Sequence, residues 1–200
     1  GTWSIALNPF VERTLSKKDV ADDCINYMRI NGKPVKSARL FLGNEYSIQV
    51  KKLTEHYQVG KDYHKTVKFD PEIHYEIVKE FEKIFKWESI EDPEMPEETH
   101  LRYTSFDHAY HHLMMELVLL QVESIKSAKG NMTIEKLFVD GGFSDNDIYI
   151  HLLSHHFRTM ELRTTDSSLG SALGAAICIS DTQLNSEFLK KNYSMKKHIP

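Results

Sequence analysis

Residues 137–146 carry the residue types best suited to bind a nucleotide or a phosphate group. The apolar segment 137–139 runs into Asp140, Gly141 and Gly142, and small polar residues and a helix-like segment follow. This pattern predicts a buried strand, a tight turn, and a helix whose first backbone N–H groups are free. Because glycine has no Cβ, a flat ligand or a phosphate can approach the main chain closely at such a turn. An ordinary strand–turn–helix corner would explain the same residues.

Histidine is abundant, and six of the 11 histidines fall in two groups: His108, His111 and His112, and His151, His155 and His156. Two pairs, His108 with His112 and His151 with His155, are spaced four residues apart, so each pair could present two imidazoles on one helix face. Neither pair has the glutamate of an HExxH metal motif. We therefore assign no metal site and expect hydrogen-bonded surface histidines.

Several common catalytic motifs do not occur in the sequence. It contains no GxSxG nucleophile elbow, no GxxxxGK[ST] phosphate loop and no GxGxxG dinucleotide fingerprint. Neither Cys24 nor Cys178 has a basic sequence neighbour that would activate it. At the start of the chain, the Gly1 N–H and the Thr2 hydroxyl could hold phosphate oxygens, although these residues could equally be a plain chain end.

The composition is that of an ordinary globular protein of 200 residues, with a net charge of -4. No basic stripe with interleaved aromatic residues is present, so we expect no nucleic-acid partner. We also expect no membrane partner and a cytoplasmic location, because the sequence shows neither a signal peptide nor a long apolar run. The chain opens without Met on a strand-like segment, and we expect it to be a piece of a longer protein.

The elements that would position these residues can be predicted from periodicity and turn residues. Strands are expected at 2–8, 20–30 and 34–42, the last two joined by a hairpin at Asn31-Gly32, and at 136–140 and 159–163. Helices are expected from about 44 to Gly60, after the Asp70-Pro71 start, and from the Ser105 cap to about 128. Two further helices are expected after a Ser144 cap with Asp147 in a capping box, and over 169–179. The acidic run 88–98 is interpreted as a solvated loop, and residues 164–168 as a polar turn.

Three segments of this sequence resemble the C-terminal half of the FGGY carbohydrate kinases. They are Gly1-Thr2-Trp3-Ser4, Val139-Asp140-Gly141-Gly142 with Ser144 and Asn146, and the run 168–176, which reads SLGSALGAA. The resemblance covers essentially the whole chain in order and is most specific over residues 137–176. The opening residues are most similar to rhamnulokinase- and fuculokinase-like members.

The resemblance implies an α/β fold: a ribonuclease H-like (actin-like ATPase) domain with a mixed five-stranded sheet and flanking helices. Residues 1–200 would form a single C-terminal nucleotide-binding domain with a helical insertion over about 44–130. The implied activity is ATP-dependent transfer of the γ-phosphoryl group to a hydroxyl of a ketose or polyol, with Mg²⁺. The implied partners are the protein's own N-terminal domain and a small sugar, and a homodimer is left open.

The resemblance also assigns site residues. Gly1 and Thr2 would hold the β- and γ-phosphates of ATP. The adenosine pocket would be lined by Gly141, Gly142 and Asn146, and Gly174 would give room for the adenosine or for helix packing. No catalytic residue is assigned within the chain, because in the family the proton-accepting aspartate precedes the Gly-Thr motif.

Two features depart from the family pattern. The long helix has the run 109–117 where family members often show Arg-x-x-x-Glu-Gly, which affects expectations about sugar specificity and interdomain packing. Phe143 is a bulky variant of the turn that could stack near adenine or fill the core. A non-catalytic actin-like module that binds nucleotide or a partner remains the alternative function.

Overall fold

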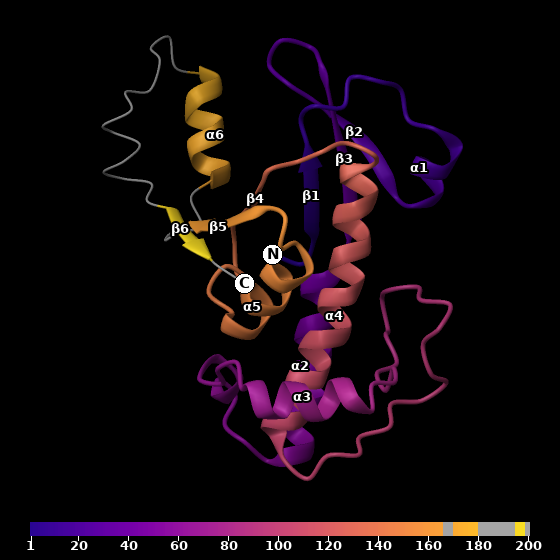
Figure 1. The fold of residues 1–200 in the computed structure, drawn as a ribbon, viewed down its shortest axis with the longest axis vertical. Helices are drawn as coiled ribbons and strands as arrows, with labels where there is room; N and C mark the ends of the chain where they lie inside the picture. The colour runs from indigo at the N-terminus through magenta and orange to yellow at the C-terminus, as the bar shows by residue number, and fades with distance from the viewer. Residues whose placement is uncertain (166–169, 180–194, 199–200) are drawn as a thin grey trace. The chain divides into compact units, whose positions relative to one another are not determined.

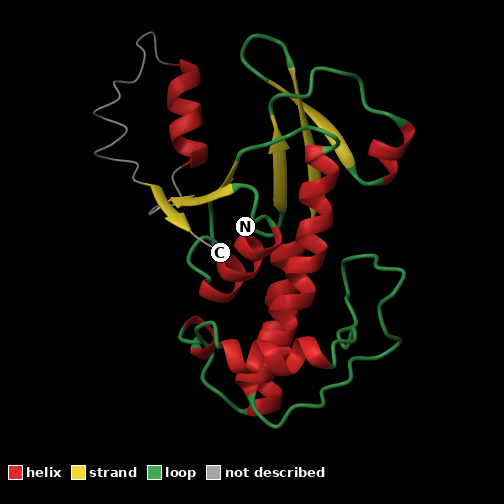
Figure 2. Cartoon of the chain, viewed as in Figure 1, coloured by secondary structure: helices red, strands yellow, loops and turns green. Residues whose placement is uncertain are grey.

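The computed structural model describes residues 1–165, 170–179 and 195–198 (Figure 1). The chain divides into two compact units, Gly1–Gly130 and Asn131–Pro200. Both units combine helices and strands, as Figure 2 shows. The α/β class predicted from the sequence is therefore confirmed.

The sheet of the first unit is antiparallel and has the strand order β1-β3-β2. Its strands are β1 (Ser4–Asn8), β2 (Cys24–Met28) and β3 (Pro34–Leu40). The predicted hairpin between β2 and β3 is confirmed: Gly32 has a φ of 78°, and its N–H donates to the Arg29 carbonyl oxygen over 2.9 Å. Glycine reaches this left-handed conformation without the steric cost of a Cβ, so Asn31-Gly32 closes the turn.

The remaining elements of the first unit are helical. They are α1 (Lys17–Ala21), α2 (Leu42–Tyr57), the 3-10 helix η1 (Tyr63–Lys65), α3 (Pro71–Lys79) and α4 (Phe106–Lys129). The predicted starts of α3 and α4 are confirmed, because the Asp70 and Ser105 side chains accept N–H groups of the first turns. Helix α4 packs on β1 and β3 and against α2 and α3 (Figure 1). Several of its apolar side chains, including Leu113, Met114 and Leu117, are fully buried and form the centre of the core.

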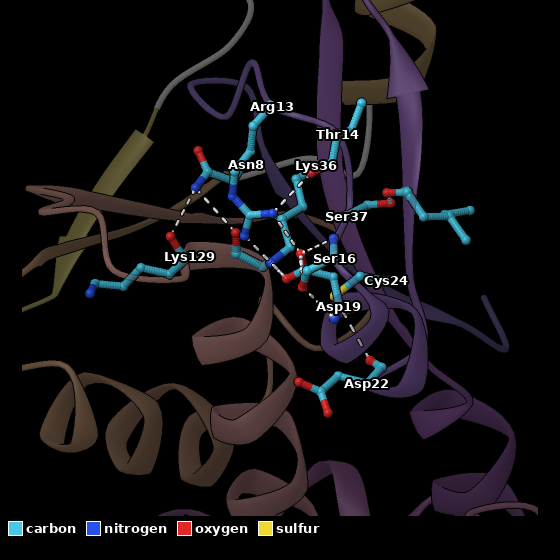
Figure 3. Close-up of polar contacts among 12 residues, drawn as sticks. Asn8, Arg13, Thr14, Ser16, Asp19, Asp22, Cys24, Lys36, Ser37 and Lys129 are labelled. Carbon is cyan, nitrogen blue, oxygen red and sulfur yellow. Dashed lines mark hydrogen bonds and ion pairs between the residues drawn. The ribbon is translucent and has the colours of Figure 1, made fainter.

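A buried ion pair holds α1 on this sheet, as Figure 3 shows. Lys36 on β3 is 1% exposed, and its ammonium group donates to the carboxylate of Asp19. Asp19 also accepts from Arg13 at 2.7 Å and from the Ser16 N–H at 2.7 Å. Nearby, the Asn8 amide donates to the carbonyl oxygens of residues 128 and 129 at the end of α4. These contacts connect the two ends of the unit's sequence.

Between α3 and α4, residues 80–105 contain no helix or strand. Buried side chains of α2 and α4 hold this segment in place. Glu116 of α4, for example, accepts the N–H groups of Ile84 at 2.7 Å and of Phe85 at 3.3 Å. The acidic run 88–98 lies in this segment, as the loop interpretation predicts, but Asp92 within it is buried and paired with Lys83.

The second unit has a mixed sheet of order β4-β5-β6. Strands β4 (Lys136–Val139) and β5 (Glu161–Thr165) are parallel, and β6 (Met195–His198) pairs antiparallel to β5. Helix α5 (Asp147–His156) connects β4 to β5, and α6 (Gly170–Ile179) follows β5 in the chain. The parallel pair with its crossover helix is the βαβ arrangement typical of α/β sheets.

Several predicted boundaries need correction. The described strands form two three-stranded sheets, one in each unit, and the single five-stranded sheet that was expected is not found among them. Local alternation identifies extended segments, but it does not encode which distant strands pair. Thr164 and Thr165, expected in a turn, extend β5 because they pair with Lys196 and Met195 of β6. Leu169 and residues 166–168 lie outside the described part of the chain.

The start of α5 also differs from the prediction. Its N-cap is Asn146, whose side-chain oxygen accepts the Tyr149 N–H at 3.0 Å. Ser144, the predicted cap, lies in the preceding turn, where its hydroxyl donates to the Gly141 carbonyl oxygen. The preceding turn extends two residues further than expected, and this displaces the start of the helix.

Candidate functional site

The first part of the candidate site is the contact between Gly1-Thr2 and the first turn of α2. The Asn44 N–H donates to the Thr2 carbonyl oxygen over 3.0 Å. A Cβ on Gly43 would overlap the Gly1 carbonyl oxygen and would lie 3.2 Å from that of Thr2. Gly43 is therefore required for the close approach of the two main chains.

The start of α2 is a helix N-terminus whose Asn44 N–H already donates to the Thr2 carbonyl oxygen and whose first turn includes the buried Glu45. Its N-cap, Phe41, makes no side-chain hydrogen bond to the first turn, so the cap does not occupy the N–H groups there. The partial positive charge of a helix N-terminus favours a phosphate at this position. Both Gly1 and Thr2 are exposed beside it, and the Trp3 ring packs on Phe41 with centroids 4.5 Å apart. Thr2 could therefore offer its hydroxyl to a ligand at this turn.

The second part is the turn after β4. Gly141 has a φ of 94°, and its carbonyl oxygen accepts the Ser144 N–H at 2.9 Å and the Ser144 hydroxyl at 2.7 Å. A Cβ added at Gly141 or Gly142 would meet nothing within 4 Å, so the surface of this turn is open. The predicted strand–turn–helix with a positive-φ glycine is found, and it leaves room for a flat ligand against the main chain. The strand itself is not buried as predicted, because Phe138 of β4 is 55% exposed.

At the same edge of this sheet, the carboxyl ends of the parallel strands β4 and β5 lie side by side. The Thr165 hydroxyl donates to the Asp140 carboxylate over 2.5 Å. Ligands of open α/β sheets bind at the carboxyl ends of the strands. Asp140 was part of the predicted motif but had no assigned role, and Thr165 was not selected. The sequence did carry a signal for both residues, because Asp140 directly follows β4 and Thr165 is the last residue of β5.

The other predicted residues of this unit have clear structural roles or open surroundings. The side-chain oxygen of Asn146 caps α5, as described above. Phe143 packs on the Tyr149 ring at a centroid distance of 4.7 Å, and burial raises the pKa of Tyr149. Phe143 is half-buried and makes this ring contact, while its stacking near adenine stays a prediction. Gly174 lies exposed in α6, where a Cβ added to it would meet nothing within 4 Å.

The six predicted residues thus fall in two groups. Gly1 and Thr2 lie together in the first unit, with Gly43 and Asn44 of α2 beside them. The second unit contains Gly141, Gly142 and Asn146 around one turn, and Gly174 on a separate helix. Gly43 and Asn44 were overlooked because the sequence pattern marked them only as the point where the period changes from strand to helix.

With this geometry established, the chain can be compared with known proteins. It is similar to the crystal structure of a carbohydrate kinase from Novosphingobium aromaticivorans, with a TM-score of 0.64 and 18% sequence identity. The fold is carbohydrate kinase-like. The match covers 100% of this chain and 42% of the kinase chain, so the present sequence spans less than half of that protein. No protein-family model matches the sequence, and no curated protein matches it.

Within this kinase-like fold, the histidine-rich part of α4 has a structural role. His111 and His112 are buried, not on the surface as predicted. The His112 ring contacts the Tyr103 hydroxyl at 2.7 Å and the Glu82 carbonyl oxygen at 2.9 Å. The Asp70 N–H donates to His111 Nε2 over 3.0 Å, and burial lowers the pKa of His111. The apolar helix period passes through this region, so these rings face the core and hold neighbouring segments.

A dedicated metal cage is not found in the described part of the chain, where no three His, Cys, Asp or Glu residues are arranged to hold an ion. The run 109–117, where the sequence lacks an Arg-x-x-x-Glu-Gly pattern, lies largely within the core of the first unit. Its Glu116 binds main-chain N–H groups of the 80–105 segment. No described helix is both long enough and apolar enough to cross a membrane.

Proposed function

We propose that this chain is the C-terminal, ATP-binding half of an FGGY-type sugar kinase. The parent enzyme would transfer the γ-phosphoryl group of ATP to a hydroxyl of a ketose or polyol, with L-rhamnulose- or L-fuculose-like sugars as the substrate class. The observation that supports this most directly is the contact of Gly1-Thr2 with the first turn of α2, in a chain whose fold is carbohydrate kinase-like. A main-chain cradle of this kind suits phosphoryl transfer, which needs positioning and charge neutralisation more than covalent chemistry.

In this proposal the two groups of residues have different roles. Gly1, Thr2 and the first turn of α2 hold the β- and γ-phosphates, because an exposed hydroxyl and a helix N-terminus meet there. The open main chain of Gly141 and Gly142, with Asn146 capping the next helix, lines the adenosine pocket. Gly174 gives room for the nucleoside or for helix packing. The ribonuclease H-like domain would have its helical insertion at about 44–130.

The residues present fit a nucleotide carried with Mg²⁺. Mg²⁺ commonly keeps several waters and is held by substrate phosphates and one or two carboxylates, so the protein needs no multi-residue cage. When bound, the ion would neutralise charge on the phosphates. Asp140, which accepts a hydrogen bond from Thr165, lies at the turn assigned to adenosine, so we do not assign it to the ion that the phosphates at Gly1 and Thr2 would carry.

The proposal extends to the rest of the parent protein. The resemblance places the proton-accepting aspartate before the Gly-Thr motif, so we propose no catalytic base among the described residues. Sugar contacts would come mainly from the protein's own N-terminal domain, in a cytoplasmic enzyme. These 200 residues should bind nucleotide without turning over sugar, and sugar-dependent ADP formation by them alone would contradict this part of the proposal.

The adenosine assignment is tested by titrating ATP into the complete protein carrying Gly142→Leu. We expect at least about tenfold weaker binding, because the leucine side chain would occupy the open surface of the turn. Gly60→Leu is the matched control, since Gly60 also has nothing within 4 Å of its Cβ position but lies outside the site. ATP affinity that is the same in both variants would refute the adenosine assignment.

A further inference from the structure

The segment 80–105 is long for a connection without regular structure. Segments of this length in compact proteins are uncommon, and those that are ordered often serve a function. Side chains of α2 and α4 bind its main chain at several points. One of them is Glu116 of α4, which accepts the N–H groups of Ile84 and Phe85. The contacts with α2 run along the helix, from Asn44 and Glu45 at its start to Tyr57 at its end.

Glu45 makes the main contact between this segment and α2. It is 0% exposed, and one carboxylate oxygen accepts the Glu88 N–H at 3.0 Å, the Ser89 N–H at 2.9 Å and the Ser89 hydroxyl at 2.8 Å. The other oxygen accepts from the Gln49 amide at 2.7 Å, and the same amide group donates to the Lys86 carbonyl oxygen at 2.9 Å. Four donors compensate for burial of this carboxylate, so the contact is strong and geometrically specific.

Ser89 connects this carboxylate to the phosphate-side turn. Its hydroxyl donates to Glu45 and accepts from the Asn44 side-chain amide over 3.2 Å. The main-chain N–H of Asn44 in turn donates to the Thr2 carbonyl oxygen. Asn44 is therefore held from two sides, by the loop through its side chain and by Thr2 through its main chain. A displacement of Ser89 would be transmitted directly to the turn that Thr2 contacts.

We infer that Ser89 and Glu45 are positioning residues that hold the first turn of α2 and Thr2 in the arrangement that binds the phosphates of a nucleotide. This inference rests on the proposed function. Its physical basis is preorganisation: affinity falls in proportion to the fraction of molecules whose turn is correctly arranged. The 80–105 segment thereby contributes to nucleotide affinity without contacting the nucleotide.

The binding test uses Ser89→Ala in the complete protein, with ADP and Mg²⁺ titrated calorimetrically. Loss of the hydroxyl removes its hydrogen bonds with Asn44 and Glu45 but leaves the Ser89 N–H on Glu45, so the fold should persist. We expect about fivefold to tenfold weaker ADP binding, the effect of losing the partly buried hydrogen bond from the Asn44 side chain. The separate variant Ser89→Thr keeps the hydroxyl and should therefore bind ADP as the unmodified protein does. The control is Thr54→Ala, which removes a hydroxyl bound only within α2 and should leave affinity unchanged.

Hydrogen–deuterium exchange of peptides covering residues 42–46 provides a readout that does not need a ligand. We expect faster exchange in Ser89→Ala and not in Thr54→Ala, because the Asn44 N–H loses the support of its side chain. Unchanged exchange over 42–46, or unchanged ADP affinity in Ser89→Ala, would overturn the inference. If the unmodified protein fails to bind ADP while Ser89→Ala still exchanges faster over 42–46, the proposed function is wrong. The conclusion that Ser89 supports the first turn of α2 would then still hold.

Discussion

Replacing Asp19 with asparagine should destabilise the first unit severely. The Lys36 side chain is 2% exposed, so its ammonium group cannot reach water when its partner loses its charge. Removing one member of a buried ion pair typically costs about 3–5 kcal/mol. We expect about 3 kcal/mol, because the asparagine oxygen can still accept one hydrogen bond. The contribution of Arg13 is smaller, since its side chain is 54% exposed.

The assay is urea unfolding followed by tryptophan fluorescence. Both tryptophans, Trp3 and Trp87, belong to the first unit, so the signal reports on that unit. With a denaturant dependence of about 2 kcal/mol per M, a loss of about 3 kcal/mol lowers the midpoint by about 1.5 M. Lys36→Met should cost less than Asp19→Asn, because Asp19 would keep its Arg13 and Ser16 donors.

Asp23→Asn is the matched control for this prediction. Asp23 pairs with Arg39, but its side chain is 51% exposed, so the change should cost at most about 1 kcal/mol. Asparagine also tolerates the positive φ of 52° at this position. If Asp19→Asn loses no more free energy of unfolding than Asp23→Asn, the reasoning that Asp19 stabilises the buried ammonium group of Lys36 is refuted.

Three further predictions follow from the same structure. Gly43→Ala should cost about 1–3 kcal/mol in urea unfolding, because the added methyl overlaps the Gly1 carbonyl, whereas Gly60→Ala should be nearly neutral; equal effects would contradict this. Asn146→Ala should lower the stability of the second unit by about 1 kcal/mol in thermal unfolding followed by circular dichroism, while Asn146→Asp keeps the cap; an unchanged melting temperature for Asn146→Ala would argue against the cap. The Arg13 guanidinium, with Lys36 and Ser16, lowers the pKa of Asp19, so the stabilisation contributed by the charged Asp19 is present above about pH 4 and is lost as the pH falls below that value. The difference in unfolding free energy between the unmodified protein and Asp19→Asn should therefore narrow in acid, and a constant difference would contradict the shift.

Local signals in the sequence predicted much of the fold. The Asn31-Gly32 hairpin, the Asp70 and Ser105 caps and the Asp140-Gly141-Gly142 turn were all identified because each depends on residues close together in the chain. Gly141 and Gly142, two of the predicted site residues, lie in the turn after β4, as the sequence predicted. Nucleotide binding by them remains a proposal.

The parts that were missed depend on contacts between distant residues. Glu45 and Glu116 look like ordinary polar positions of amphipathic helices, yet their partners lie some 30 to 45 positions away in the chain. His112 is buried for the same reason, since its partner Glu82 is 30 residues distant. Gly43 is required by the approach of Gly1, which no periodicity in the sequence reveals. The pairing of strands into two separate sheets is likewise a long-range property.

The way in which Glu45 and Glu116 hold residues 80–105 has a consequence for how this protein can vary. Both carboxylates accept two main-chain N–H groups of this segment, which every residue except proline provides. These hydrogen bonds therefore do not depend on which side chains the segment carries, whereas Ile84 and Phe85, each 1% exposed, also anchor it in the core. Related proteins could exchange the outward-facing residues of this segment, and with them its surface chemistry, while keeping two glutamates and the same backbone course.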